Sequence, residues 1–154
     1  MLALDGSGSI SEKDWGRFMA FTDKLIEALP IGKGKMQVGL IEFATTSVLV
    51  QPLTDDKSVI EKARKDKMTR NQGIRTYMSK AAAMARPQLA NKKMPRTLVV
   101  ITDGLPSNRS ATTEQFHAAK AEGIHVVMVT VGMPCSLLVW VATSSPIPSF
   151  AILL

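Results

Sequence analysis

The sequence predicts an α/β fold, in which a doubly wound, mostly parallel sheet carries helices on both faces and has one antiparallel edge strand. Apolar stretches of strand length alternate with stretches of helical periodicity along the 154 residues. The segments 97–103 and 124–131 are almost continuously apolar, which is typical of parallel strands covered on both faces. The segments 36–43 and 47–53 lie close together in sequence, which favours a hairpin at one edge.

The first half of the chain predicts a short strand followed by a long helix. MLAL, residues 1–4, is the strand. The helix begins at Ser11, since Asp14 three residues later resembles the partner in a capping box. Pro30 and Gly32 end it. Its apolar face is predicted from residues at helical spacing: Trp15, Phe18, Met19, Thr22, Leu25, Ile26 and Leu29.

The rest of the chain predicts three more helices between the strands. Two of them are predicted over 57–68 and 77–90. Pro87 should kink or end the later of these two. Thr112 and Gln115 predict the cap of a further helix, and Gly123 its end.

Composition and length indicate a single domain, 1–154, with a core of its own. Apolar residues make up 45% of the chain, which excludes an intrinsically disordered sequence. The alternating pattern stops near 132, and the segment 133–154 is atypical: it has no Lys, Arg, Asp or Glu. A short helix in SLLVWVAT and a last strand in FAILL are expected there. Prolines and serines interrupt this run, so no membrane span is predicted.

Two predicted strands end in Asp followed by Gly, in LALDG and VITDG. Asp5 and Asp103 should therefore emerge at the same edge of the sheet. After Asp5, the glycines let the turn direct the hydroxyls of Ser7 and Ser9 to one spot. Hard oxygen ligands of this kind suit Mg²⁺ best, with Mn²⁺ or Ca²⁺ as alternatives. The structural alternative is a Gly/Ser-rich turn that only caps the following helix.

DGSGS after a first strand and ITDG after a later one resemble the metal-ion-dependent adhesion site (MIDAS) of von Willebrand factor A domains, also called integrin I domains. The resemblance covers about residues 2–132 and implies their Rossmann-like fold. It also implies a third site element in NQGIRTYMSKAA, either Thr76 or Ser79. Compared with members of this family, the chain looks truncated at both ends. Its first strand is short, where a family member would usually have chain before it, and the closing amphipathic helix has no counterpart.

The resemblance further implies a function. Ser7, Ser9 and Thr76 would coordinate the metal directly or nearly so, and Asp5 and Asp103 would hold it directly or through water. An acidic residue of a protein ligand would fill the open position. Family members of this kind are adhesion modules rather than enzymes, so no catalytic residue is expected. They imply an extracellular or cell-surface location within a larger protein. No signal peptide is visible in the sequence, and an intracellular location stays open.

The formal net charge of +6 is unevenly distributed, since residues 57–96 carry twelve Lys or Arg against two acids. This stretch is either a set of solvated helix faces or a surface for sulfated glycosaminoglycans and other polyanions. Together with LPIG before 36–43, it resembles the adhesive modules of apicomplexan micronemal and thrombospondin-related proteins. Nucleic acid is disfavoured because no aromatic platform interleaves the cations. The candidate polyanion-binding residues are Lys62, Lys65, Lys67, Arg70 and Arg75.

Two rival functions remain on the sequence alone. A Mg²⁺-dependent phosphohydrolase of the haloacid dehalogenase type also uses a first-strand Asp and a later strand-end Asp. It needs a second Asp two residues after the first, where this chain has Ser7. The other rival is a scaffold domain that binds partners without a metal.

Overall fold

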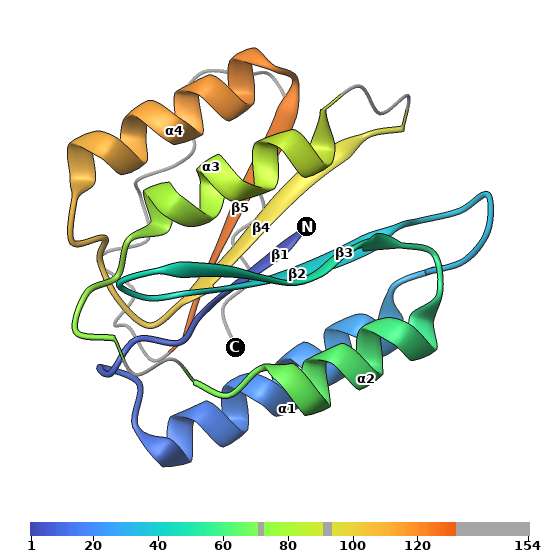
Figure 1. Cartoon of the computed structure of the whole chain (residues 1–154), viewed down its shortest axis with the longest axis horizontal. Helices are drawn as coiled ribbons and strands as arrows, with labels where there is room; N and C mark the ends of the chain where they lie inside the picture. Colours follow the sequence, from blue (N-terminus) through green and yellow to red (C-terminus); the bar gives the residue numbers. More distant parts are fainter. Residues whose placement is uncertain (71–72, 91–93, 132–154) are drawn as a thin grey trace.

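The described strands form one sheet in the order β3-β2-β1-β4-β5 (Figure 1). The computed structural model describes residues 1–70, 73–90 and 94–131. β1 pairs in parallel with both β2 and β4, and β5 is parallel to β4, whereas the edge strand β3 is antiparallel to β2. The predicted fold class is therefore confirmed. The bounds are β1 Leu2–Asp5, β2 Val38–Phe43, β3 Ser47–Thr54, β4 Arg96–Thr102 and β5 Ile124–Thr130.

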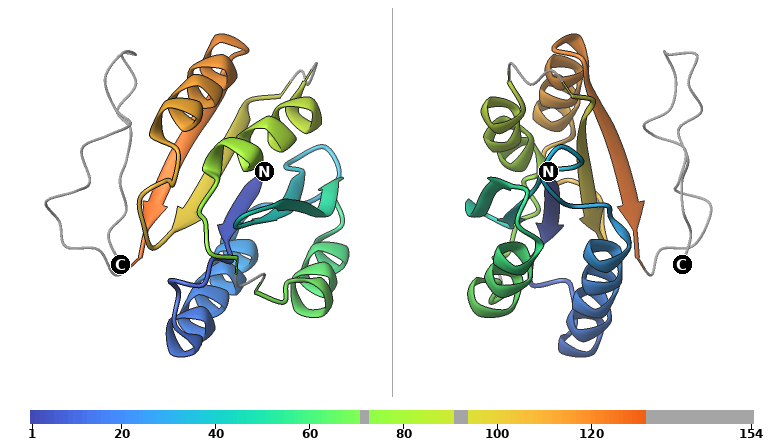
Figure 2. Two further views of the ribbon diagram at one scale, coloured as in Figure 1. Left: turned by 60° about the vertical axis from the view of Figure 1, so that its left-hand side comes forward. Right: turned by 90° about the vertical axis from the view of Figure 1, so that its right-hand side faces the viewer.

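Two helices cover each face of the sheet within the described part of the chain (Figures 1 and 2). α1 and α2 lie on one face, and α3 and α4 lie on the other. Both faces are covered because the helices follow strands on either side of β1, where the strand order reverses. The bounds are α1 Glu12–Ala28, α2 Lys57–Lys67, α3 Met78–Leu89 and α4 Arg109–Ala121.

The core has two layers, because alternate residues of each strand point to opposite faces. In β1, Ala3 packs with the α3/α4 layer, whereas Leu2 and Leu4 pack with the α1/α2 layer. Phe18 and Ile26 of the predicted apolar face of α1 are fully buried in the latter. Burial on both sides explains why the middle of β1 and of β4 is apolar.

The helix caps confirm one prediction and correct another. The side chain of Ser11 accepts a hydrogen bond from the Asp14 N–H, as predicted for the start of α1. The predicted cap of α4 is wrong, because this helix begins earlier, with the Asn108 side chain accepting from the Ala111 N–H. Thr112 lies inside α4, where its hydroxyl donates to the Asn108 carbonyl oxygen, and Gln115 serves a different network. α3 continues through Pro87 and ends two residues later.

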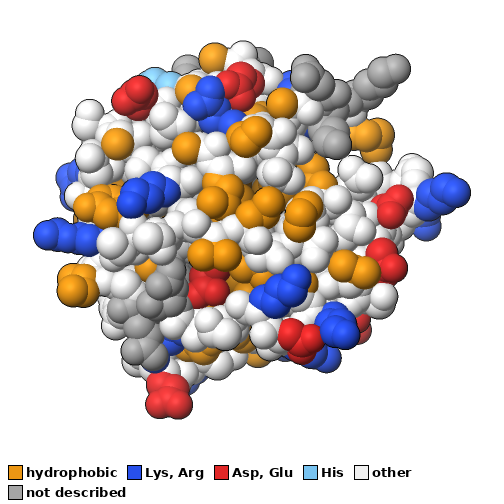
Figure 3. All heavy atoms as spheres, viewed as in Figure 1, with side chains coloured by type: hydrophobic (Ala, Val, Ile, Leu, Met, Phe, Trp, Pro, Cys, Tyr) orange, Lys and Arg blue, Asp and Glu red, His pale blue; other side chains and the backbone are white. Residues whose placement is uncertain are grey.

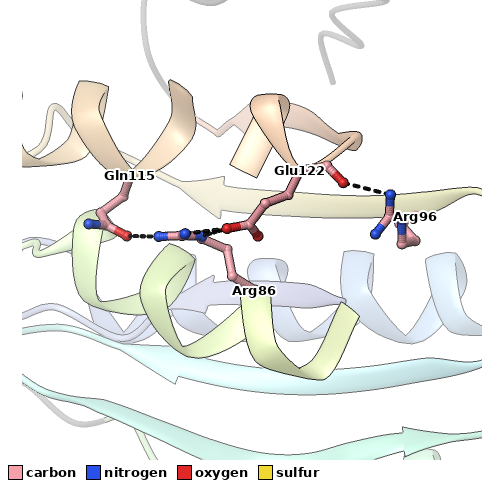
Figure 4. A network of polar contacts seen from close by, with 4 residues as sticks. All are labelled: Arg86, Arg96, Gln115 and Glu122. Carbon is pink, nitrogen blue, oxygen red and sulfur yellow. Dashed lines mark hydrogen bonds and ion pairs between the residues drawn. The ribbon is translucent and has the colours of Figure 1, made fainter. Parts of the chain in front are cut away.

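An arginine network joins α3 to α4 (Figure 4). The Arg86 guanidinium donates to the Gln115 side-chain oxygen at 2.8 Å and, through Nε, to the Glu122 carboxylate at 3.0 Å. Arg96, at the start of β4, donates to the Glu122 backbone carbonyl at 2.6 Å. The network therefore fixes the two helices near the amino end of β4, away from the strand ends that carry the two aspartates.

The face that carries α3 and the β2–β3 hairpin shows apolar side chains across its middle (Figure 3). Leu49, Leu53 and Met84 pack there, partly buried, against the core. None of the helices in the described ranges is long and apolar enough to cross a membrane. The expected helix in SLLVWVAT and strand in FAILL, within 133–154, lie outside the described residues.

Candidate metal-binding site

The two strand-end aspartates lie on neighbouring strands. β1 and β4 pair in parallel, with Leu4 opposite Ile101, so Asp5 and the residues that end β4 lie at one edge of the sheet. Figure 1 shows this edge at the left, where the loops after β1 and β4 approach each other. Ligands of open α/β sheets bind at such a position, beyond the carboxyl ends of strands where the strand order reverses.

Asp5 is fully buried and is held by two neutral donors. Its carboxylate accepts a hydrogen bond from the Ser7 backbone N–H at 2.9 Å and another from the Thr102 hydroxyl at 2.6 Å. Burial raises the pKa of Asp5 above its ordinary value, and the nearby Asp103 charge adds a smaller effect in the same direction. A buried carboxylate with a raised pKa is one that a nearby cation would stabilise in its charged form.

A chain of side-chain oxygens leads from the buried part of the site to the surface. The Ser7 and Ser9 hydroxyls are hydrogen-bonded at 2.9 Å, and the Ser9 hydroxyl donates to the Asp103 carboxylate at 3.2 Å. Ser7 is buried, Ser9 is exposed and Asp103 is half-buried. Burial also raises the pKa of Asp103. The site is therefore closed on the side of Asp5 and open to solvent at Ser9.

The loop that carries Thr76 joins the other two loops through the backbone. The Thr76 N–H donates to the Ser107 hydroxyl at 2.9 Å, and the Ser107 N–H donates to the Thr76 carbonyl at 3.0 Å. The Gly73 carbonyl accepts from the Gly8 N–H, between the two serines, at 3.0 Å. Thr76 is itself buried, whereas Ser79 lies in the first turn of α3. These bonds place the Thr76 loop against both the β1–α1 and the β4–α4 loops.

Two residues that position this site were missed in the sequence, and the packing role of a third, the glycine that leads the Thr76 loop, was not predicted. Thr102 fixes the Asp5 carboxylate, and Ser107 fixes the Thr76 backbone. Gly73 permits the close contact of its loop with the β2–β3 turn, because a Cβ there would lie 2.8 Å from both the backbone nitrogen and the hydroxyl of Thr45. A Thr directly before the strand-end Asp was a visible signal, whereas the contact of Ser107 with Thr76 has none in the local pattern.

The donor set fits a hard divalent cation. Two carboxylates would balance its charge, and the serine hydroxyls add neutral oxygens. No group of three or more His, Cys, Asp or Glu that could hold a metal occurs within 1–70, 73–90 and 94–131, so nothing there resembles a thiolate or imidazole centre. The phosphohydrolase alternative needs a second carboxylate where Ser7 stands, and Ser7 instead donates its backbone N–H to Asp5.

The candidate polyanion-binding residues divide into two groups. Lys62, Lys65 and Lys67 of α2 are exposed, and so is Arg75 beside the Thr76 loop. Arg70 is half-buried, and its guanidinium donates to the Ile10 carbonyl oxygen in the loop after β1. Arg70 therefore ties two loops of the site together, and its cation is partly withdrawn from the surface.

The fold and this arrangement of strand-end side chains define a class of protein that sequence comparison also identifies. The sequence-family model for the von Willebrand factor type A domain matches residues 1–136, and the chain belongs to that family. Matrilin-3 of Gallus gallus is 27% identical over 141 residues, which cover 84% of this chain. The chain spans only 30% of matrilin-3's own length.

Solved structures show the same fold. Proximal thread matrix protein 1 from the mussel byssus, with a zinc-occupied MIDAS motif, superposes with a TM-score of 0.76 at 21% identity, covering 86% of this chain and 37% of that one. Manganese-loaded Plasmodium vivax TRAP protein gives 0.75 at 20% identity, covering 86% of this chain and 56% of that one. A mussel and an apicomplexan protein are thus equally similar in fold, so the likeness does not single out the apicomplexan adhesins.

Proposed function

We propose that this chain is a protein-binding module of adhesive type that captures an acidic side chain of a partner through a bound divalent cation. Asp5, Ser7, Ser9, Thr76 and Asp103 hold the cation in this proposal. The observation that carries it is the continuous set of contacts from Asp5 through Ser7 and Ser9 to Asp103, which ends at the surface.

Each residue has a distinct part in this proposal. Asp5 supplies a buried, fixed negative charge, and Asp103 supplies a second one that solvent can reach. Ser7 and Ser9 supply neutral oxygens, so the two carboxylates just balance a divalent charge and the site adds no excess negative charge that would repel an external carboxylate. A cation bound there would act as a Lewis acid that attracts an external carboxylate. Mg²⁺ and Mn²⁺ suit this oxygen set best. The zinc-occupied MIDAS motif of the mussel protein and the manganese loading of the Plasmodium protein support the proposal.

Metal-dependent binding of immobilised poly-L-glutamate tests this function. Wild type should bind in Mn²⁺ and release in a chelator, and Asp103→Ala should bind weakly under both conditions. Simple charge attraction would behave in the opposite way, because removing Asp103 makes the chain more positive. Asp55→Ala removes the same charge from an exposed position between β3 and α2, and it should keep the Mn²⁺ dependence. Binding that ignores the chelator would contradict the proposal.

A second surface, made of Lys62, Lys65 and Lys67 on α2, is proposed to bind sulfated glycans. All three side chains are exposed, whereas Arg64 of the same helix is paired with Asp23 of α1. Heparin retention should therefore fall steeply with salt. Reversing all three lysines to Glu should abolish retention. Reversing Lys13, Lys33 and Lys35, which are exposed elsewhere, changes the net charge equally and should reduce retention less. Equal losses would mean that only net charge matters.

Such binding properties suit a module of a larger extracellular or cell-surface protein, which is the setting we propose for this chain. The mussel protein with the same fold is named as a matrix protein, proximal thread matrix protein 1. No catalytic step is proposed, since none of the residues brought together here is placed as a nucleophile with a base.

A further inference from the structure

Two large apolar side chains stand exposed beside the candidate metal site. Ile74, in the loop before α3, is 94% exposed, and Leu105, in the loop after β4, is 45% exposed. An almost fully exposed Ile contributes almost no burial to the fold, so folding alone does not account for it. Their position relative to the site is therefore of interest.

Backbone contacts place both residues close to the loops that carry the site oxygens. Ile74 directly follows Gly73, whose carbonyl accepts from Gly8 between the two site serines. Leu105 follows Asp103 by two residues. The two loops are joined by the paired hydrogen bonds between Thr76 and Ser107. Ile74 and Leu105 each lie two residues before this junction, within about 7 Å along the chain. Both apolar groups therefore lie at the rim of the site.

A cation completes the same rim. Arg75 lies between Ile74 and Thr76, and its side chain is exposed while its backbone N–H donates to the Thr45 hydroxyl. The loop is thus anchored through its backbone, and it presents the side chains of Ile74 and Arg75 to solvent. Apolar side chains and a cation thus lie next to a site that would bind a carboxylate. This arrangement is complementary to a peptide in which an acidic residue has an apolar neighbour and a second acidic residue nearby.

We infer that Ile74 and Leu105 select protein ligands in which the captured acidic residue is flanked by a large apolar side chain, and that Arg75 favours a second acidic residue. The inference rests on the proposed metal-dependent function and names the partner class of that same site. Apolar burial supplies affinity at the rim, whereas Arg75 mainly supplies discrimination and a faster association.

A short peptide library with a fixed central Glu, each flanking position being Leu, Ser or Glu, tests this selection by fluorescence anisotropy in Mn²⁺. Wild type should prefer Leu beside the central Glu by about tenfold over Ser. Ile74→Ser and Leu105→Ser should each remove most of this preference, and Arg75→Gln should remove the preference for a second Glu. Met94→Ser is the matched control: Met94 is 57% exposed but precedes β4 at its other end.

Calorimetric Mn²⁺ titration of the same variants separates the two levels of the proposal. Ile74→Ser and Leu105→Ser should keep the wild-type Mn²⁺ affinity, because neither residue is placed among the ligands. Wild type that binds no Mn²⁺ would refute the proposed function itself. Wild type that binds Mn²⁺ and binds the Glu peptides, but without apolar preference, would refute only the partner assignment. Wild type that binds Mn²⁺ but none of the peptides would refute the capture of an acidic side chain as well. Self-association that Ile74→Ser abolishes would assign the rim to a second copy of this chain instead.

Discussion

The Thr102 hydroxyl donates a 2.6 Å hydrogen bond to the Asp5 carboxylate, and both residues are fully buried although they lie 97 positions apart in the chain. This bond links the last residue of β4 to the last residue of β1. It fixes the orientation of Asp5 from behind, and the Ser7 N–H fixes its other oxygen. Residues that orient a ligand in this way tune metal affinity as strongly as many ligands do.

Thr102→Val should therefore weaken Mn²⁺ binding by about 10- to 100-fold while keeping the fold, since Val has nearly the shape of Thr without the hydroxyl. Thr22→Val is the matched control, because Thr22 is equally buried but donates to the Phe18 carbonyl within α1. The control should change stability by about 1 kcal/mol and leave Mn²⁺ affinity unaltered. Parallel effects of both variants on Mn²⁺ affinity in calorimetry would show that Thr102 has no positioning role.

Asp5→Asn should stabilise the metal-free protein at neutral pH. Burial raises the pKa of Asp5, so the folded chain holds this proton more tightly than the unfolded chain does. The free energy of unfolding therefore falls as the pH rises from the ordinary value of 3.8 through the raised one. The Asn side chain carries no charge, so the variant does not lose this free energy of unfolding as the pH rises. Its amide N–H₂ can donate to the Thr102 hydroxyl, which can turn its own proton to the Gly104 carbonyl 3.3 Å away.

Thermal unfolding of both proteins in a chelator, across the acid to neutral range, measures this effect. The advantage of Asp5→Asn should shrink as the pH falls through the raised pKa and should be smallest below 3.8, where the wild-type carboxyl is protonated in both states. In Mn²⁺ the order should reverse, because only wild type gains stability from the ion. A variant less stable than wild type in chelator at neutral pH would show that the Asp5 charge is already compensated.

Gly73→Ala should disturb the site, whereas Gly16→Ala should not. A Cβ at position 73 would lie 2.8 Å from two Thr45 atoms and 3.0 Å from the Ala44 Cβ, so the Thr76 loop would have to shift. Mn²⁺ affinity should fall with it. A Cβ at Gly16 meets nothing within 4 Å, and Gly16 lies inside α1, so Ala there should stabilise the protein by about 0.5–1 kcal/mol. Unchanged Mn²⁺ binding by Gly73→Ala would remove this loop from the site.

Arg86→Met should lower the melting temperature without changing Mn²⁺ affinity. The Arg86 guanidinium binds both Gln115 and Glu122, and it lowers the pKa of the Glu122 carboxyl through their hydrogen bond. Arg17→Met is the control, since its pair with Asp14 is mostly exposed and should contribute little. A loss of Mn²⁺ affinity in Arg86→Met would mean that the far end of the sheet is coupled to the site.

The sequence was sufficient to predict the fold and the two strand-end aspartates, because both follow from short-range patterns. Apolar periodicity defines the elements, and parallel pairing then brings the ends of β1 and β4 to one edge. The contacts that shape the site are long-range, and no local spacing reveals them. Ser107 reaches Thr76 across 31 positions, and Arg70 reaches Ile10 across 60. Arg70 therefore looks like a surface cation in the sequence, although its guanidinium holds a loop of the site.

The cap of α4 was mispredicted for a related reason. Thr112 and Gln115 have the spacing of a capping pair, but Asn108 takes the cap one turn earlier. The Thr112 hydroxyl then bonds back to the Asn108 carbonyl, and Gln115 is turned toward Arg86 of another helix. A residue whose local spacing suggests a helix cap can thus hydrogen-bond instead to a side chain from another part of the fold.

Isothermal calorimetry with Mg²⁺ and Mn²⁺, on wild type and on Asp103→Ala, tests the central claim most directly. Asp103 is half-buried and bonded to Ser9 at the open end of the site, so its loss should leave the core intact. Wild type should bind a single ion per chain, and Asp103→Ala should lose this binding by about 100-fold or more, since half of the charge that balances the cation is gone. Equal binding by the two proteins would contradict the claim, because the ion would then be held without Asp103. A wild type that binds neither ion would also contradict it and would leave a metal-free scaffold as the function of this domain.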